Sequence, residues 1–509
     1  MKSIIPSTYS LWRALWQLRF ITPKGIFYWG ESIFREGVTL MALLRFSAKS
    51  YPNQLALVSN DEKITYSSLY RSAQSLTYLL YRHYGLRRGM RVALLCRNHA
   101  LVPFILAALS RLGVAAHLLN TDMGAEKLGQ LLASKHRYDL FIIDSSLMEG
   151  FELSLKGERV VYSEQLSQEL QDSALTASIS LPYIWRGAEM TVLSGGSSGH
   201  YHEAARRPSA VQFLPPLVAL LRQIGIHRYK SVYIALPLYH GFGLATLITS
   251  LVMGKMVVLT RRFYTEEALH TIEKYQVQVM PLVPVMLARL LQEDGASEQL
   301  RSLRCILSGG DRLERKLVTD TERLLGKVLY NLYGTSEAGF FLLATPVDLA
   351  NNKQTTLGKP IAGVYCRIER PDDQGIGTLW VRSRWAMNGR RNRWQSTGDR
   401  MCRNKFGYYF HEGRVDSMIV SGGENLYPDV VERTIAAHPA VLTVQVRPIP
   451  HPQWGQVLEA LVELHPNHSL SEKNLREWLR PRIARHEMPH RIYFGKVHLL
   501  ETGKRRWER

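Results

Sequence analysis

Several short stretches of this 509-residue sequence combine glycine with hydroxyl, carboxylate or cationic side chains. The first, SGGSSGHYH at 194–202, consists mostly of small residues, which would let backbone N–H groups approach phosphate oxygens. It lacks the Gly-Lys-Ser/Thr ending of a Walker A loop. It therefore predicts a phosphate-binding loop of another kind, with a plain surface turn as the alternative. The candidate residues are Ser194, Gly196, Ser197, Ser198 and Gly199.

Two further stretches contain candidate ligands, and the first of them follows a predicted strand, where an open α/β sheet places its ligands. SGGDRL (308–313) has paired glycines that would let the backbone approach a ligand closely. YGTSEAG (333–339) brings an aromatic ring, a hydroxyl and a carboxylate together, and carboxylate oxygen is a hard ligand suited to Mg²⁺. The alternatives are an ordinary strand-to-helix turn and a solvated glutamate. The candidate residues are Gly309, Gly310, Asp311, Tyr333, Gly334, Ser336 and Glu337.

Charged candidates also lie outside these glycine-rich stretches. Asp399 in STGD and Arg414 in GRVD supply a two-oxygen acceptor and a cation, with a surface ion pair as the alternative. Lys504 in ETGKRRW lies five residues from the C-terminus, where most lysines are solvated. His240 in LYHGFG lies in an apolar run, which favours a buried structural histidine as strongly as a site residue.

The elements that must position these residues follow an alternation of strands and helices. A strand pattern at 91–99, a helical pattern at 100–113 and a strand pattern at 114–119 recur within 231–260 and again before SGGDRL. This alternation predicts parallel sheets covered on both faces. From about 355 to 410, short alternating runs predict antiparallel β structure. The last part of the chain mixes one strand, VLTVQVRPI, with Arg-rich helix.

Charge and cysteine content narrow the classes of partner. The net charge of +20 would attract nucleic acid, anionic lipid or polyphosphate, but no nucleic-acid-binding motif is visible in the sequence. Phosphate-rich small molecules and a membrane surface therefore lead. The four cysteines, Cys96, Cys305, Cys366 and Cys402, have no metal-type or redox-type spacing, which indicates reduced thiols in a cytoplasmic protein.

The first 30 residues do not have the pattern of a signal peptide, because Arg13 and Arg19 interrupt the apolar region. Trp12, Leu15, Trp16 and Phe20 share a helical face. We expect this face to pack on the protein's own core. The alternative is an interfacial helix that rests on a membrane.

Five stretches, taken in order, resemble the motifs of the adenylate-forming superfamily, which includes acyl-CoA synthetases, luciferases and peptide-synthetase adenylation domains. They are LSGGSSGHYHEAARR (193–207), LPLYHGFG (236–243), YGTSEAG (333–339), STGDR with GRVDSMIVSGGENLYPDVVE (396–432) and ETGKRRW (501–507). The resemblance covers nearly the whole chain from about residue 35, and AARRPS is most similar to bacterial fatty acyl-CoA ligases.

The resemblance implies an α/β fold with three parts. These are an N-terminal amphipathic extension over 1–34, a large domain over 35–415 and a small mobile α+β domain over 416–509. The large domain is expected to contain two parallel-sheet α/β layers and a small β-barrel.

The resemblance also gives the glycine-rich loop a role, which is to clasp the β- and γ-phosphates of ATP. Here Tyr201 replaces the family's proline and His202 replaces its lysine. A neutral histidine supplies less charge than an ammonium group, but Arg206 and Arg207 lie close enough to substitute. We interpret the loop as altered but working.

In the family, the remaining motifs hold the nucleotide. The SGGDRL turn would pack against adenine, with Tyr333 stacked on the ring. Ser336 would bind the α-phosphate and Glu337 would bind Mg²⁺. Asp399 would accept both ribose hydroxyls, helped by Arg414.

Other motif residues correspond to moving or pocket-lining parts. Asp416 occupies the family's hinge position, and Gly422 and Gly423 would line the pantetheine tunnel after the small domain rotates. Lys504 would bridge the substrate carboxylate and the α-phosphate during adenylation. His240 would form a wall of the carboxylate pocket.

These features predict an AMP-forming ligase that uses ATP, Mg²⁺ and CoA to activate an apolar carboxylic acid. We expect a fatty acid and leave an aryl acid open. One alternative is an acyl-AMP ligase that loads an acyl carrier protein. Another is a catalytically impaired homologue that binds acyl groups or nucleotides, suggested by Tyr201 and His202. We expect no nucleic-acid partner, a cytoplasmic location, and peripheral contact with the inner face of the membrane as an open alternative.

Overall fold

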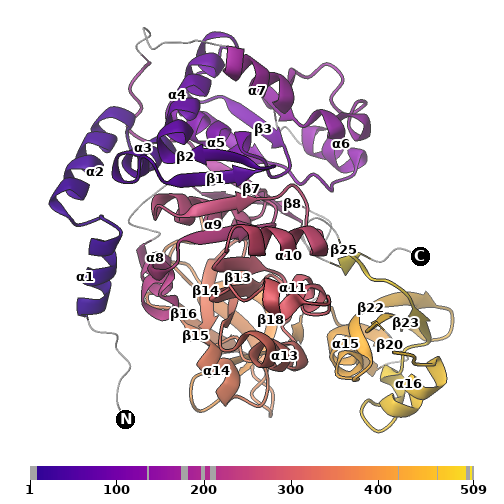
Figure 1. The fold of residues 1–509 in the computed structure, drawn as a ribbon. Coiled ribbons are helices and arrows are strands. Elements are labelled where there is room, and N and C mark those ends of the chain that lie inside the picture. The colour runs from indigo at the N-terminus through magenta and orange to yellow at the C-terminus, as the bar shows by residue number, and fades with distance from the viewer. Residues whose placement is uncertain are drawn as a thin grey trace. The chain divides into compact units, whose positions relative to one another are not determined.

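The computed structural model describes residues 8–133, 137–172, 181–195, 201–206, 214–415, 417–421, 424–466, 468–499 and 505–506. The chain divides into two compact units, and Figure 1 shows their elements. Unit 1 comprises Met1–Pro281, Ser302–Arg304 and Met387–Gly389. Unit 2 comprises Leu282–Arg301, Cys305–Ala386 and Arg390–Arg509. Among the described helices, none has both the length and the apolar character that a membrane crossing requires.

Unit 1 begins with three helices, α1 (Thr8–Gln17), α2 (Pro23–Glu36) and α3 (Leu40–Ser50). The Thr22 and Thr39 side chains cap α2 and α3 by accepting backbone N–H groups. The expectation that one aromatic face packs on the core is wrong for Trp12 and Trp16, which are exposed. Because α1 ends at Gln17, Phe20 lies beyond the helix and packs instead against Phe46.

One six-stranded sheet of unit 1 has the order β6-β5-β3-β4-β7-β8, parallel except for the β7–β8 pair. The predicted strand–helix–strand pattern at 91–119 is confirmed as β3, α5 and β4. Every residue of α5 is buried, which explains its uniformly apolar sequence. The elements are α4 (Tyr66–Arg82), β3 (Arg91–Leu95), α5 (Leu101–Leu112), β4 (Ala115–Leu118), α6 (Ala125–Ala133), β5 (Leu140–Ile143), β6 (Val160–Tyr162), α7 (Ser163–Asp172), β7 (Met190–Gly195) and β8 (Tyr201–Arg206).

A second group of strands in unit 1 has the order β11-β9-β10-β1-β2. Its parallel pairs confirm the alternation predicted within 231–260. The elements are β1 (Leu55–Ser59), β2 (Glu62–Thr65), α8 (Leu214–Ala219), β9 (Ser231–Ile234), α9 (Gly241–Val252), β10 (Met256–Leu259), α10 (Thr265–Lys274) and β11 (Val279–Leu282).

Unit 2 contains the neighbouring strands β15-β14-β13-β12, of which β12 and β13 are parallel. The stretch expected to be antiparallel forms a four-stranded antiparallel sheet, β16-β17-β18-β19. The elements are α11 (Pro284–Leu290), α12 (Ala296–Gln299), β12 (Cys305–Gly309), α13 (Arg315–Leu325), β13 (Leu329–Thr335), β14 (Gly339–Ala344), α14 (Pro346–Asn351), β15 (Lys359–Pro360), β16 (Tyr365–Glu369), β17 (Gly377–Arg382), β18 (Gln395–Arg403) and β19 (Tyr409–Arg414).

The C-terminal part of unit 2 has a sheet and a hydrophobic core of its own. The predicted strand VLTVQVRPI is confirmed as β22, but β23 beside it was not predicted. The middle of β23 is buried at six successive positions, so its sequence lacks the alternation that marks a half-exposed strand. The elements are β20 (Ile419–Ser421), β21 (Glu424–Leu426), α15 (Pro428–Ala436), β22 (Val441–His451), β23 (Gly455–Leu464), α16 (Glu472–Leu479), β24 (Arg491–Phe494), β25 (His498–Leu499) and β26 (Arg505–Arg506).

Candidate functional site

Two of the predicted motifs lie side by side at the carboxyl ends of β12 and β13. The parallel register pairs Ser308 with Asn331 and Gly309 with Leu332, so Gly309, the last residue of β12, lies beside the residue that precedes Tyr333 on β13. Gly310 continues the turn with φ of +83°, a left-handed backbone conformation that residues with a Cβ atom rarely adopt. This is the edge at which an open α/β sheet binds ligands.

A tyrosine, an aspartate and an arginine converge beside this edge, although they come from three strands. The Tyr333 hydroxyl on β13 donates a hydrogen bond to Asp399 Oδ2 on β18. Arg414 Nη1 on β19 lies 3.2 Å from Asp399 Oδ1, and the β18–β19 register places these two residues opposite each other. The Asp399 side chain is almost fully buried, so its charge is compensated by partners rather than by water.

Burial raises the pKa of Tyr333 well above its usual range, and the adjacent Asp399 carboxylate raises that pKa further. The phenol therefore stays protonated at all assay pH values and acts as a hydrogen-bond donor. Its ring packs edge-on against Phe341, with the ring centroids 5.1 Å apart. The Tyr333 side chain is thus held at both parts, because its ring contacts Phe341 and its hydroxyl binds Asp399.

The turn after β13 carries a hydroxyl and a carboxylate. A Cβ added to Gly334 would lie 2.4 Å from the Gly339 carbonyl oxygen, so the close approach of β13 and β14 requires glycine there. Thr335 Oγ1 accepts the Ala338 N–H at 3.0 Å and closes the turn. Ser336 is exposed. Within the described residues the Glu337 carboxylate makes no hydrogen bond or ion pair, which suits a group that binds a cation.

Two further residues hold this region together, and the sequence analysis missed both. Asp429 Oδ2 accepts the Arg414 backbone N–H at 3.1 Å and the Ser417 hydroxyl at 3.2 Å. His411 Nε2 lies 3.5 Å from Asp399 Oδ1, where it adds a third group to this carboxylate. Asp429 lies in the first turn of α15, and an acidic residue there was a usable signal.

The glycine-rich loop is the connection of a β-hairpin. β7 and β8 pair antiparallel, with Ser194 opposite His202 and Gly195 opposite Tyr201. The connecting residues, which include the candidates Gly196, Ser197, Ser198 and Gly199, lie outside the described part of the chain, as do Asp416, Gly422, Gly423 and Lys504.

In unit 1, His240 lies at the N-terminus of α9, directly after an irregular turn. Asn98 holds this turn from both sides, because its amide donates to the Leu236 carbonyl at 3.0 Å and accepts the Leu238 N–H at 2.9 Å. The His240 ring lies 4.9 Å from that of Tyr239 and is partly buried. This placement suits a wall residue better than a solvated proton carrier.

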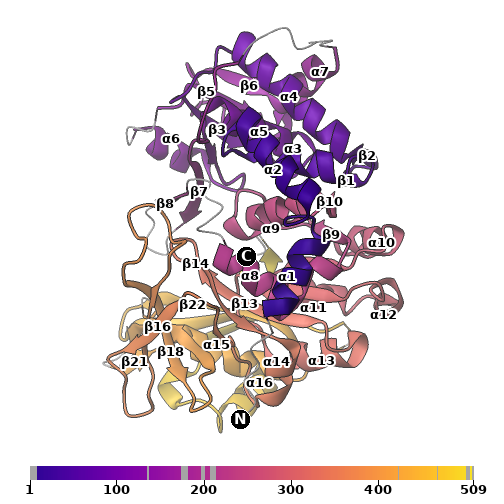
Figure 2. The same ribbon diagram turned by 90° about the vertical axis from the view of Figure 1, so that its left-hand side faces the viewer.

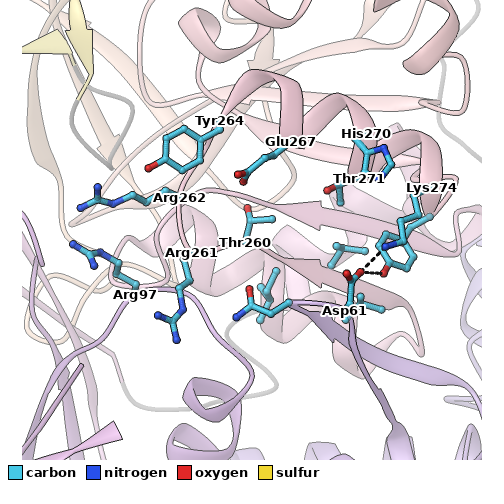
Figure 3. Close-up of a pocket in the computed structure, with 15 residues that line it drawn as sticks. Asp61, Arg97, Thr260, Arg261, Arg262, Tyr264, Glu267, His270, Thr271 and Lys274 are labelled. Carbon is cyan, nitrogen blue, oxygen red and sulfur yellow. Dashed lines mark hydrogen bonds and ion pairs between the residues drawn. The ribbon is translucent and has the colours of Figure 1, made fainter. Parts of the chain in front are cut away.

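Unit 1 also contains an open pocket of about 550 Å³, which sequence reasoning did not predict. Arg97, Arg261 and Arg262 enter it from two separate segments, and Figure 3 shows them on one side of the pocket. On the other side, Asp61 neutralises Lys274 through a 2.6 Å ion pair and also accepts the Tyr275 hydroxyl. The arginine side therefore carries a local excess of positive charge that favours an anionic ligand.

A compact Cys96–His99–Asp144 cluster lies close to this pocket in sequence, and its three ligand atoms are within 4.8 Å of one another. The Asp144 oxygens, however, already accept from His99 at 3.0 Å, from Ser163 at 2.7 Å and from the Arg97 N–H at 2.9 Å. These bonds join the ends of β3 and β5 to the start of α7. We interpret the cluster as a structural network.

This interpretation predicts the effect of Asp144→Asn. Burial raises the Asp144 pKa, but the bonds from His99, Ser163 and Arg97 outweigh burial and leave the pKa lowered. The stabilisation is therefore present above the usual aspartate pKa of 3.8 and is lost as the pH falls through the lower folded-state value. We expect the variant to lose about 1–3 kcal/mol at neutral pH. Thermal unfolding at pH 7 and pH 3 should show a difference from the parent that shrinks in acid; a difference independent of pH would contradict this.

Comparison with known proteins matches nearly the whole chain. The model of the AMP-binding enzyme family matches residues 44–188 and 215–389. The model of the AMP-binding enzyme C-terminal domain matches residues 430–504, a range that ends at Lys504. The interval between the first two ranges contains the glycine-rich hairpin, which is the motif that departs most from the family pattern.

Two curated relatives are 2-succinylbenzoate–CoA ligases. The ligase of Bacillus subtilis strain 168 is 28 % identical over 468 residues, which cover 88 % of this chain and 92 % of the relative. The ligase of Oceanobacillus iheyensis is 26 % identical over 456 residues, which cover 87 % and 92 %.

Solved structures of CoA ligases are also similar to this chain. The o-succinylbenzoate CoA synthetase of Bacillus subtilis, in complex with its acyl-adenylate intermediate, aligns with a TM-score of 0.76 and 26 % identity over 91 % of this chain and 96 % of that one. An anthranilate CoA ligase in complex with anthranoyl-AMP aligns with a TM-score of 0.78 over 92 % and 95 %, but its 22 % identity supports the fold alone. The predicted α/β fold class is confirmed.

Proposed function

The chain belongs to the AMP-binding enzyme family, and we propose that it is an adenylate-forming ligase that joins an apolar carboxylic acid to the thiol of CoA. The observation that carries this proposal is the convergence of Tyr333, Asp399 and Arg414 beside the glycine turn at the ends of β12 and β13. A buried carboxylate held by a phenol and a guanidinium, next to a flat glycine turn, suits a ribose and its base.

The first half-reaction follows from these positions. A carboxylate oxygen of the substrate attacks the α-phosphorus of ATP, the bond to the β-phosphate oxygen breaks, and pyrophosphate leaves. Glu337 is the residue that would hold Mg²⁺, which neutralises phosphate charge when bound. Ser336 would donate to the α-phosphate, and Lys504 would bridge that phosphate and the substrate carboxylate. The protein thus contributes positioning and charge neutralisation.

In the second half-reaction the CoA thiol loses its proton to water and its sulfur attacks the acyl carbonyl carbon. The bond between the acyl carbon and AMP then breaks, and AMP leaves. For this step we propose that Asp416 is the hinge, that Gly422 and Gly423 line the path of the pantetheine arm, and that the hairpin bearing His202 works as a phosphate loop despite its altered residues. Two relatives named as CoA ligases support CoA as the acceptor, and their names give no support to a carrier protein.

The relatives bear on the acid as well. Both are named for succinylbenzoate, an aromatic acid, so they do not support the expectation of a fatty acid. We propose an apolar acid that bears a ring and keep fatty acids as competitors in the assay.

The test is ATP–pyrophosphate exchange with purified protein across aryl acids and medium- and long-chain fatty acids, followed by transfer to CoA or to a phosphopantetheinyl carrier. We expect exchange that depends on the acid, strongest with an aryl acid, and thioester formation with CoA. Exchange with none of the acids would refute the ligase, and preference for a fatty acid would refute the ring-bearing substrate.

The arginine side of the pocket in Figure 3 is our candidate for the phosphates of CoA. Arg97, Arg261 and Arg262 gather there, and CoA carries three phosphate groups. Replacing the three arginines with glutamine should raise the KM for CoA roughly tenfold and leave the KM for ATP unchanged. Lys274→Gln is the matched control, because Asp61 already neutralises this lysine. Equal effects of the triple variant and the control on the CoA KM would contradict the assignment.

A further inference from the structure

Helix α2 packs Trp29 against Phe46 but exposes other large apolar side chains to an unusual degree. A surface helix normally turns its apolar face inward, but α2 buries Gly25, Ser32 and Glu36. On the outside, Phe27 is 67 % exposed and Phe34 is 80 % exposed. These two positions are seven residues apart and therefore lie on one face, two turns from each other. The exposed face of α2 is thus aromatic.

Hydrogen bonds and ion pairs hold the Glu36 and Glu31 side chains of α2 in place, so the helix cannot rotate to bury its aromatic side chains. Glu36 Oε2 accepts from Arg111 Nε at 2.8 Å, and Glu36 Oε1 accepts the Tyr70 hydroxyl at 2.6 Å. Glu31 on the same helix bonds Arg45 at 2.7 Å. Rotating α2 would break these buried charge pairs, and each loss is costly.

Helix α1 also exposes aromatic side chains. Trp12 and Trp16 are 54 % and 43 % exposed and stack on each other with ring centroids 5.2 Å apart. Figure 1 shows α1 and α2 at one edge of unit 1, and Figure 2, which looks onto that edge, shows both in front. We call the exposed large apolar side chains of these two helices, Trp12, Trp16, Ile26, Phe27 and Phe34, the α1–α2 surface.

The charges around the α1–α2 surface have one sign. The exposed charged residues between positions 11 and 36 are Arg13, Arg19, Lys24 and Arg35. Of the two acidic residues in this range, Glu36 is buried against the partners named above. Glu31 pairs with Arg45 and also lies 3.5 Å from Arg35, so it neutralises part of the Arg35 charge.

From this combination we propose that the α1–α2 surface binds an anionic phospholipid membrane. Tryptophan and phenylalanine insert at the boundary between head groups and acyl chains, and arginine and lysine beside them attract anionic head groups. This pattern does not favour a second copy of the chain, because a two-fold interface through this surface would bring together two patches of the same positive charge. The proposal does not depend on the enzymatic activity.

The test is flotation of the full-length protein with vesicles of phosphatidylcholine alone or with about 30 % phosphatidylglycerol. We expect binding to the anionic vesicles only. The double variant Phe27→Ser/Phe34→Ser should bind at least about tenfold more weakly, since it removes two side chains that insert. Neither residue packs inside the fold, so thermal unfolding should be unchanged. Lys24→Gln/Arg35→Gln should also weaken the binding and reduce its sensitivity to salt.

Phe406→Ser is the matched control, since Phe406 is 66 % exposed and lies beside the cation Lys405, far along the chain from α1 and α2. This control should float like the parent. Failure of the parent to bind anionic vesicles, or equal losses in the double variant and in Phe406→Ser, would overturn the proposal. So would a dimer, measured by light scattering, that disappears in the double variant, because that result would give the surface to a second copy.

Discussion

Lys504→Ala should lower the rate of acyl-adenylate formation by about 10²–10³-fold, while transfer from a supplied acyl-adenylate to CoA keeps most of its rate. The reason is that negative charge grows on the α-phosphoryl oxygens only in the first step. An ammonium group placed there stabilises that transition state and has no comparable task when a thiol displaces AMP.

The two steps can be measured separately, by pyrophosphate exchange for the first and by CoA thioester formation from synthetic acyl-adenylate for the second. Lys496→Ala is the control, because this lysine is exposed and lies in the same C-terminal segment. It should leave both rates unchanged. Equal loss of both steps in Lys504→Ala would argue against a lysine that acts in only one of them.

Local pattern predicted the elements that carry the site. The parallel strands and the buried helix α5 are largely apolar, and glycine follows α5 and β12, so β3, α5, β4 and β12 follow from the sequence. Local pattern did not predict that the site residues converge. Tyr333 and Asp399 are 66 positions apart on strands of different sheets, and only resemblance to a family, not periodicity, indicated that they meet.

Other features depended on tertiary packing that leaves little trace in sequence. The pocket of Figure 3 is assembled from segments around residues 60, 97 and 261–275, none of which has a motif of its own. For α1, the hydrophobic pattern identified a face but not the side on which it lies. Hydrophobic periodicity cannot distinguish a helix face that packs on the protein's own core from one that contacts an apolar environment outside the protein.

Asp399→Asn should lower kcat/KM for ATP by about 100-fold. Asparagine has nearly the same shape, but one carboxylate oxygen becomes an NH₂ donor that cannot accept the Tyr333 hydroxyl and a ribose hydroxyl. The charge opposite Arg414 also disappears, which leaves a cation without its closest anion at 3.2 Å. The variant should also lose about 1–3 kcal/mol of stability, so thermal unfolding must be measured beside the kinetics.

Ribose binding can be separated from a loss of stability by comparing ATP with 2′-deoxy-ATP as substrates of the parent and of Asp399→Asn. With the parent, 2′-deoxy-ATP should be a poorer substrate than ATP, because a buried acceptor is left without its donor. In Asp399→Asn this penalty should largely vanish, since the acceptor is already impaired and the two changes report one interaction. Tyr333→Phe keeps the ring but removes the hydroxyl, so its penalty for the deoxynucleotide should remain. If the penalty is the same in the parent and in Asp399→Asn, the carboxylate does not bind the ribose, and its bonds to Tyr333 and Arg414 only hold β13, β18 and β19 together.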